Sequence, residues 1–219
     1  MRRLIPFVFL FTTLACICLG QQSAQDDVVT KLLPNHYPQK LPTLSQAESK
    51  KVISQLRLAQ RQATGMRAQE VAFLLAAYNS DYQKNRDYLL HVLRGCATPS
   101  VQFGCDEITG AFLEALYQRG HKDVLQPLIL YGKDSYNASL AELLGYFYSR
   151  VLADDTGDFL DAIRSMRPDA QRKVCEFASG DGSGMAPKDL EQVRKKLRTN
   201  GDDLAQRCLR AVESGSKAE

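Results

Sequence analysis

The fold is decided by a segment that reads DYLLHVL at positions 87–93. The same pattern returns as DVLQPLI at 123–129 and as DFLDAIR at 158–164. Each copy has an Asp, two apolar residues, two variable positions and a further apolar residue, and successive Asp residues are 36 and 35 positions apart. Because Asp accepts a hydrogen bond from the first turn of a helix, we expect each Asp to cap the helix that it opens. Pro127 then falls in a first turn, where proline is tolerated.

Each copy follows a longer apolar segment that ends in Tyr, at 73–78, 112–117 and 143–148. The apolar residues in and around these segments are spaced at i, i+3, i+4 and i+7, which is the period of one helix face. No run of similar length alternates apolar and polar residues as a half-buried strand would. The sequence therefore predicts an all-α protein.

Two helices in a period of about 35 residues are typical of an α-solenoid. Over roughly residues 66–166 the chain resembles the tetratricopeptide and HEAT-like helical repeats, with the tetratricopeptide consensus Trp absent. The resemblance implies a right-handed array of antiparallel helix pairs and a general role in binding partners. It points to no particular member of these families.

Other residues mark helix boundaries outside the repeated segments. Ser45 with Glu48, and Ser139 with Glu142, have the spacing of capping boxes. Beyond a glycine-rich loop at 179–184, Pro187 is expected to open one helix and Asp203 the last. We expect a helical-repeat domain over 45–213, closed by a C-terminal cap, and a disordered tail over 214–219.

The first 44 residues predict export. Residues 1–20 have a basic start, an uncharged apolar run and small residues before Gln21, which is the layout of a cleaved signal peptide. An alternative is a lipobox ending at Cys16, which would make the protein a lipoprotein and give it its only predicted membrane contact. Residues 21–44 contain Pro34, Pro38 and Pro42, and this density predicts an extended Pro/Gln-rich tether without a helix.

Composition and charge limit the class of protein and the kinds of partner that the chain could bind. With 24% charged and 44% apolar residues in 219, the chain is neither wholly disordered nor a polytopic membrane protein. The formal charge of +3 falls to +1 when residues 1–20, with their two Arg, are removed. A nearly neutral chain has no general attraction for nucleic acid, so a nucleic-acid partner is not expected.

Four cysteines lie outside the signal, an even number that favours disulfides in an exported protein. Cys96 and Cys105 flank a short loop and are expected to pair, which leaves Cys175 to pair with Cys208. The alternative is a metal site formed by Cys96, Cys105, His91 and His121. Structural zinc sites use closely spaced ligand pairs that this chain lacks, so no metal and no cofactor are expected.

No motif of a known catalytic centre is present, and the chain is not predicted to be an enzyme. One alternative is kept: the pair Glu48-Ser49 resembles the catalytic Glu of exported all-α murein lyases, although it also fits the capping box of Ser45. The acidic run at 154–158 lacks the Gly and Glu positions of a calcium loop.

The remaining hypothesis is a binding module whose partner is another envelope or extracellular protein or glycan. Eight of the nine Tyr lie between Tyr78 and Tyr148, inside the repeats, and Tyr is favoured at interfaces. Most of these rings are expected to pack between helices. Three fall near predicted helix ends and are the candidate binding residues, namely Tyr82, Tyr131 and Tyr136.

Overall fold

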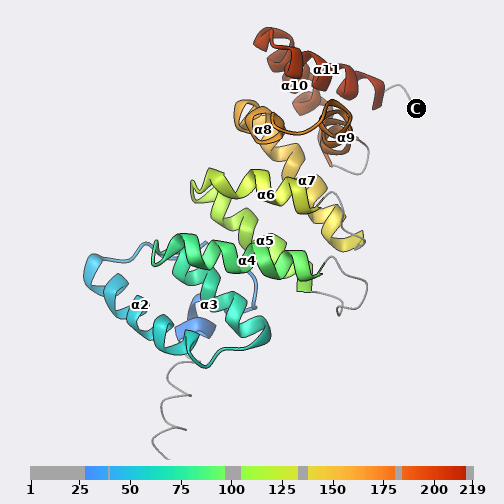
Figure 1. The fold of residues 1–219 in the computed structure, drawn as a ribbon. Coiled ribbons are helices and arrows are strands. Elements are labelled where there is room, and N and C mark those ends of the chain that lie inside the picture. Colours follow the sequence, from blue (N-terminus) through green and yellow to red (C-terminus); the bar gives the residue numbers. More distant parts are fainter. Residues whose placement is uncertain (1–27, 39, 97–104, 133–137, 181–183, 216–219) are drawn as a thin grey trace, which may run out of the picture. The chain divides into compact units, whose positions relative to one another are not determined.

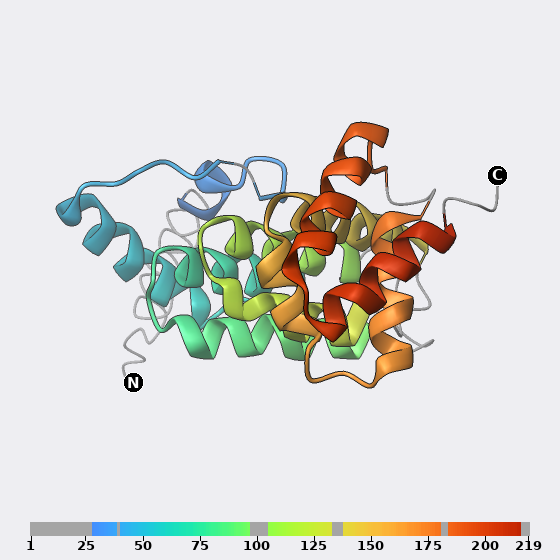
Figure 2. The ribbon, with the colours of Figure 1, turned by 90° about the horizontal axis from the view of Figure 1, so that it is seen from above.

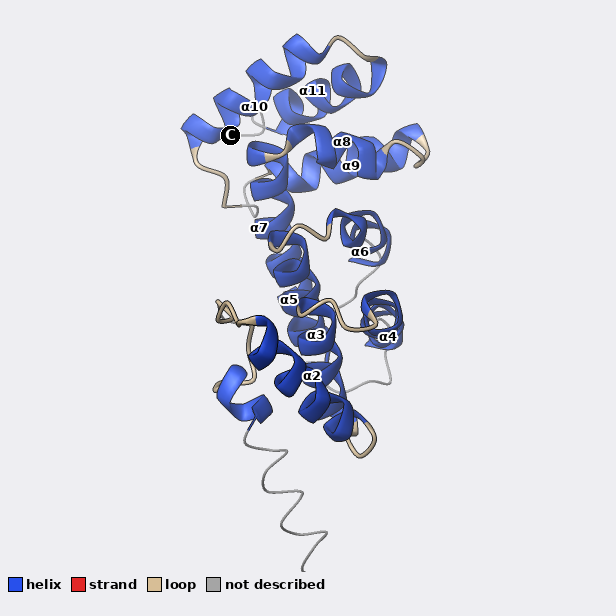
Figure 3. Ribbon diagram, turned by 90° about the vertical axis from the view of Figure 1, so that its left-hand side faces the viewer, coloured by secondary structure: helices blue, strands red, loops and turns tan. Residues whose placement is uncertain are grey.

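The computed structural model describes residues 28–38, 40–96, 105–132, 138–180 and 184–215 (Figure 1). Within these ranges every regular element is a helix and no strand occurs (Figure 3), which confirms the all-α prediction. The chain divides into two compact units, Met1–Asn85 and Arg86–Glu219, so that the segment 45–213, expected as one domain, crosses a unit boundary. The predicted signal peptide, with the alternative lipobox ending at Cys16, lies outside the described residues.

The first unit is built on two long helices, α2 (Gln46–Gln60) and α3 (Gly65–Ala77), which pack on each other. Ser45 and Glu48 form the predicted capping box: Glu48 Oε2 accepts from the Ser45 backbone N–H at 2.9 Å, and the Glu48 N–H donates to Ser45 Oγ at 3.3 Å. Helix α3 is buried on nearly all sides over residues 69–77. It is therefore the core element of this unit.

The expected tether without a helix over 21–44 is wrong at residues 28–32, whereas the described residues 33–38 and 40–44 are not helical. Residues 28–32 are helical, and Val29, Leu33 and Leu41 are buried. The helical residues 28–32 come before the first proline of the segment, Pro34. No proline therefore removes a backbone hydrogen bond from this helical turn. The side chains of Val29, Leu33 and Leu41 therefore belong to the core of the first unit, although most of the segment is exposed.

The second unit contains the end of α4 (Tyr82–Cys96) and the helices that follow it, which are α5 (Cys105–Gln118), the 3₁₀ turn η1 (Lys122–Val124), α6 (Leu125–Gly132), α7 (Ala138–Asp154), α8 (Thr156–Ile163), α9 (Pro168–Ser179), α10 (Pro187–Asn200) and α11 (Asp203–Gly215). Helix α5 packs on both α6 and α7, α7 on α8 and α9, and α11 on α9 and α10 (Figures 1 and 2). From α5 onward each helix contacts its sequence neighbour or the next but one, and α7 also contacts α10.

Helix boundaries confirm some predictions and shift others. Pro187 is the first residue of α10 and Asp203 the first of α11, as expected. Helix α11 continues through Ser214, so the predicted tail over 214–219 begins too early, and residues 216–219 lie outside the described part of the chain. Ser139 lies inside α7 and its side chain is not among those described, so the second capping box stays a prediction.

The repeated Asp residues do not cap helices. Asp87 lies in the interior of α4, Asp123 inside η1, and Asp158 is the third residue of α8. Their carboxylates instead pair with basic side chains: Arg86 binds both Asp87 and Asp123, and Lys122 binds Asp158 at 3.0 Å. The N-cap prediction was wrong because it assumed that each Asp bonds within the helix that it opens. Two of the three Asp instead pair with a basic residue about one period earlier in the chain.

The true N-cap of the last helix is Asp202, whose Oδ1 accepts from the Ala205 backbone N–H at 2.6 Å. This bond, with Arg164 nearby, holds the pKa of Asp202 below its ordinary value of 3.8. We expect Asp202→Ala to lower the free energy of unfolding by about 1 kcal/mol at neutral pH. Because the folded pKa is depressed, this stabilisation is present above pH 3.8 and is lost as the pH falls through the folded pKa. Chemical denaturation of both proteins should therefore show a difference at neutral pH that shrinks in acid; a difference independent of pH would contradict the assignment.

No helix in the described ranges is long and apolar enough to cross a bilayer.

Candidate functional site

The second unit has a polar cleft around the turn between α7 and α8. Two hollows, of about 410 and 430 Å³, share the residues Asp154 and Asp155. The first is lined by the end of α5, the loop after it and one face of α7; the second is lined by the start of α8 and the end of α10. We call the two hollows together the α7–α8 cleft. Its side chains come from elements between residues 117 and 200.

The floor of the α7–α8 cleft is formed by two aromatic rings that are almost fully buried. The rings of Tyr117 and Phe147 meet edge to face with centroids 5.4 Å apart, and their residues are only 5% and 2% exposed. The Tyr117 hydroxyl donates to Asp155 Oδ2 at 3.2 Å. The rings therefore support the polar groups at the cleft and offer no open face to a ligand.

Lys122 is the centre of the charged network. Its Nζ lies 2.9 Å from Asp155 Oδ2, 3.0 Å from Asp158 Oδ2 and 4.1 Å from the centre of the Tyr117 ring. The hydrogen bond to Asp155 raises the pKa of Lys122 and lowers that of Asp155. Burial of the ring raises the pKa of Tyr117 to about 12. At neutral pH these groups are an ammonium, a carboxylate and a neutral phenol, so none is tuned to transfer a proton near pH 7.

Two further cations are fixed at the rim. Arg150 pairs with Glu114, and the Lys196 ammonium donates to the carbonyl of Ala153 and, at 3.4 Å, to that of Asp154. Lys196 therefore satisfies carbonyl groups at the C-terminus of α7, which have no partner inside the helix. The walls of the cleft are thus held in place by contacts among its own residues.

Asp154 differs from its neighbours. Its side chain is exposed, it lines both hollows, and its carboxylate has no partner among the residues that the structure describes. A carboxylate beside fixed cations and above an apolar floor can accept hydrogen bonds from a cationic group that enters the cleft. The arrangement is suited to binding a group of mixed polar and apolar character.

The predicted binding tyrosines are not at this cleft as far as the structure describes them. Tyr82 is half-buried, begins α4 and belongs to the first unit. Tyr131 lies in α6, but its side chain is outside the described residues, as is all of Tyr136. Their role in binding stays a prediction.

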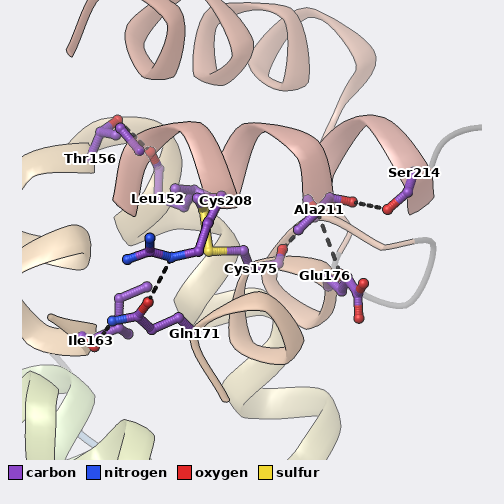
Figure 4. The surroundings of a disulfide bond; sticks show 12 residues. Leu152, Thr156, Ile163, Gln171, Cys175, Glu176, Cys208, Ala211 and Ser214 are labelled. Carbon is purple, nitrogen blue, oxygen red and sulfur yellow. Dashed lines mark hydrogen bonds between the residues drawn. A yellow bond between two sulfur atoms is a disulfide. The ribbon is translucent and has the colours of Figure 1, made fainter. Parts of the chain in front are cut away.

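The second predicted disulfide is confirmed: Cys175 of α9 and Cys208 of α11 are bonded, with Cα atoms 5.4 Å apart (Figure 4). Both cysteines are at most 1% exposed. The bridge therefore ties together the two helices expected to form the C-terminal cap. Cys96 ends α4 and Cys105 begins α5, but their side chains lie outside the described residues, so their pairing stays a prediction.

Glu48 is engaged as a helix cap. Its carboxylate accepts from Ser45 Oγ at 2.6 Å and from the Ser45 backbone, and these bonds lower its pKa. A catalytic general acid needs a raised pKa, so this environment is the opposite of the one required.

Among the described residues no three or more His, Cys, Asp or Glu side chains are grouped so that they could hold a metal ion. In the acidic run at 154–158, the carboxylates of Asp155 and Asp158 both pair with the ammonium of Lys122.

Sequence reasoning missed Tyr117, Lys122 and Asp154 as a group. One available signal was the basic residue that precedes the repeated Asp in two copies, since Arg86 and Lys122 each pair with an Asp of the following copy. The other was the acidic run at 154–158, which was tested only as a calcium loop.

No protein-family model, curated protein or solved structure matches this chain.

Proposed function

We propose that this chain is an exported helical-repeat module that binds another polypeptide through the α7–α8 cleft. The observation that carries the proposal is the carboxylate of Asp154, which lines both hollows without a partner among the described residues while the side chains around it are fixed. Such a group is available to a partner and is placed on a rigid wall, which is the arrangement that specific binding requires.

The architecture in this proposal is a short α-solenoid, a right-handed array of antiparallel helix pairs. Support comes from the spacing of polar contacts in the second unit. Glu114 with Arg150, Gln126 with Ser165, and Arg164 with Asp202 are 36, 39 and 38 residues apart. Contacts between residues one period apart are what stacked repeats produce, because each repeat touches its neighbours.

A polypeptide fits the cleft better than a glycan does. Binding sites for sugars commonly offer an open aromatic face, whereas Tyr117 and Phe147 are nearly buried. The rim has both signs of charge, with Lys122 and Arg150 beside Asp154. Mixed charge suits a polypeptide segment with a basic side chain, and the acidic side chains disfavour nucleic acid.

A binding role is also favoured over catalysis. The pKa directions of Lys122, Asp155 and Tyr117 keep each group in its ordinary charge state at neutral pH. The alternative, a murein lyase that uses Glu48, requires a raised pKa where hydrogen bonds from Ser45 lower it.

Export remains part of the proposal. The signal-like residues 1–20 support it, and the buried Cys175–Cys208 disulfide fits an oxidising compartment. The protein is periplasmic or secreted in this account, with a lipid anchor at Cys16 as the alternative.

The test is a comparison of two charge reversals. Asp154→Arg should reduce retention of protein partners from an envelope extract by at least about ten-fold, because a like charge then faces the basic group that the cleft accepts. Glu142→Arg is the matched control, because Glu142 is an exposed acid on the same helix and lines neither hollow. Quantitative pull-down with the chain from Gln21 measures the effect, and circular dichroism checks that both variants keep their helix content. Equal retention by both variants would contradict the cleft as the binding site.

A further inference from the structure

A further hollow lies between α9 and α11, and it shares no lining residue with the α7–α8 cleft. It has a volume of about 440 Å³, and Arg172 on α9 lines it together with Arg207 and Arg210 on α11. The Cys175–Cys208 bridge joins the same two helices (Figure 4). The walls of this α9–α11 hollow are therefore cross-linked covalently, which limits how far they can separate.

Arg207 is held in place from behind. Gln171, which is 3% exposed, donates from Nε2 to the backbone carbonyls of Ile163 and Arg164 at 3.3 and 3.1 Å. Its Oε1 accepts from Arg207 Nε at 3.1 Å. A buried amide thus fixes one edge of the guanidinium. The two terminal amino groups of Arg207 have no partner among the described residues and remain as donors.

The charges around the hollow favour one small anion. Arg210 also has no partner in the described part of the chain, whereas Arg172 is paired with Glu176 at 2.6 Å. Asp169 is the second acid of the lining. Three guanidinium groups and two carboxylates leave a single net positive charge, so a densely charged polyanion would meet Asp169 and Glu176.

We propose that the α9–α11 hollow binds one carboxylate of a polypeptide, on a chain end or an acidic side chain. Guanidinium is the side chain best suited to this group, because its fork of N–H donors matches the two oxygens of a carboxylate. Arg207 is pre-oriented by Gln171 and supplies the fork, and Arg210 adds charge. The site is independent of the α7–α8 cleft, so either can fail without the other.

The probes are N-acetylglycine, which has a single free carboxylate, and N-acetylglycinamide, which lacks it. Each is titrated into the isotope-labelled, oxidised exported protein while amide chemical shifts are followed by NMR. N-acetylglycine should produce saturable shifts in α9 and α11, and N-acetylglycinamide should not. Arg207→Gln should weaken the binding of N-acetylglycine about ten-fold. Arg207→Lys should also weaken it, because lysine keeps the charge but loses the fork.

Lys173→Gln is the matched control, since Lys173 is an exposed cation on α9 next to Arg172 and does not line the hollow. It should leave the affinity for N-acetylglycine unchanged. Three outcomes would overturn the proposal: no saturable shifts with N-acetylglycine, equal weakening in Lys173→Gln and Arg207→Gln, or tighter binding of a sulfated disaccharide than of N-acetylglycine. The last result would identify a polyanionic glycan as the ligand.

Discussion

Removal of the Cys175–Cys208 bridge is expected to lower the free energy of unfolding of the oxidised protein by about 2–5 kcal/mol. The bridge joins residues 33 positions apart on α9 and α11, and both sulfurs lie in the core. Its loss frees the unfolded chain, because the intervening loop is no longer closed. The substitution is Cys208→Ser, measured by chemical denaturation without reductant.

A second variant separates the lost bond from the buried polar atom that serine introduces. Cys175→Ala with Cys208→Ala removes the bridge without a buried hydroxyl or a free thiol in this pair. It should show most of the same destabilisation, and reductant should destabilise the wild-type protein more than this double variant. Unchanged stability in both variants would mean that the covalent tie contributes nothing to the C-terminal cap.

Phe147→Ala is expected to lower the free energy of unfolding by about 3–5 kcal/mol. Phe147 is 2% exposed and lies between two other rings, with centroids 5.4 Å from Tyr117 and 5.8 Å from Tyr148. Alanine leaves a cavity where α5 and α7 pack on each other, and the surrounding helices can collapse only partly. Thermal or chemical unfolding measures the loss.

The adjacent residue on α7 provides the control for this prediction. Tyr146 is 46% exposed, so Tyr146→Ala removes far less buried surface and should cost much less than Phe147→Ala. The pair tests which face of α7 is buried. If Tyr146→Ala were as destabilising as Phe147→Ala, the orientation of α7 in this account would be wrong.

The helical class could be predicted from the sequence because the apolar period is local. Ser45, Pro187 and Asp203 mark helix starts through hydrogen bonds or backbone angles within a few residues. The repeated Asp residues were misread for the opposite reason. Asp123 and Asp158 bind basic residues one period earlier, and a contact between neighbouring helices leaves no local pattern.

The candidate site was harder to predict for the same physical reason. Tyr117, Lys122 and Asp155 are brought together by packing of α5 and α7, and neither the burial of the Tyr117 ring nor its hydrogen bond to Asp155 can be derived from spacing. The Cys175–Cys208 disulfide could be predicted from the sequence, because Cys208 was the only partner left for Cys175 once Cys96 had been assigned to Cys105. That argument used counting and compartment rather than geometry.

The central claim is that the α7–α8 cleft binds a polypeptide, and site-specific photo-crosslinking tests it most directly. A photoreactive residue replaces Gln118, which is exposed and lines the cleft, or Gln62, an exposed residue of the first unit that lines no part of it. In cells that produce the protein, the account predicts a crosslink from position 118 to another polypeptide, absent at position 62 and lost when Asp154→Arg is added. Crosslinks of equal yield from both positions, none from position 118, or a crosslink that Asp154→Arg leaves unchanged would contradict it.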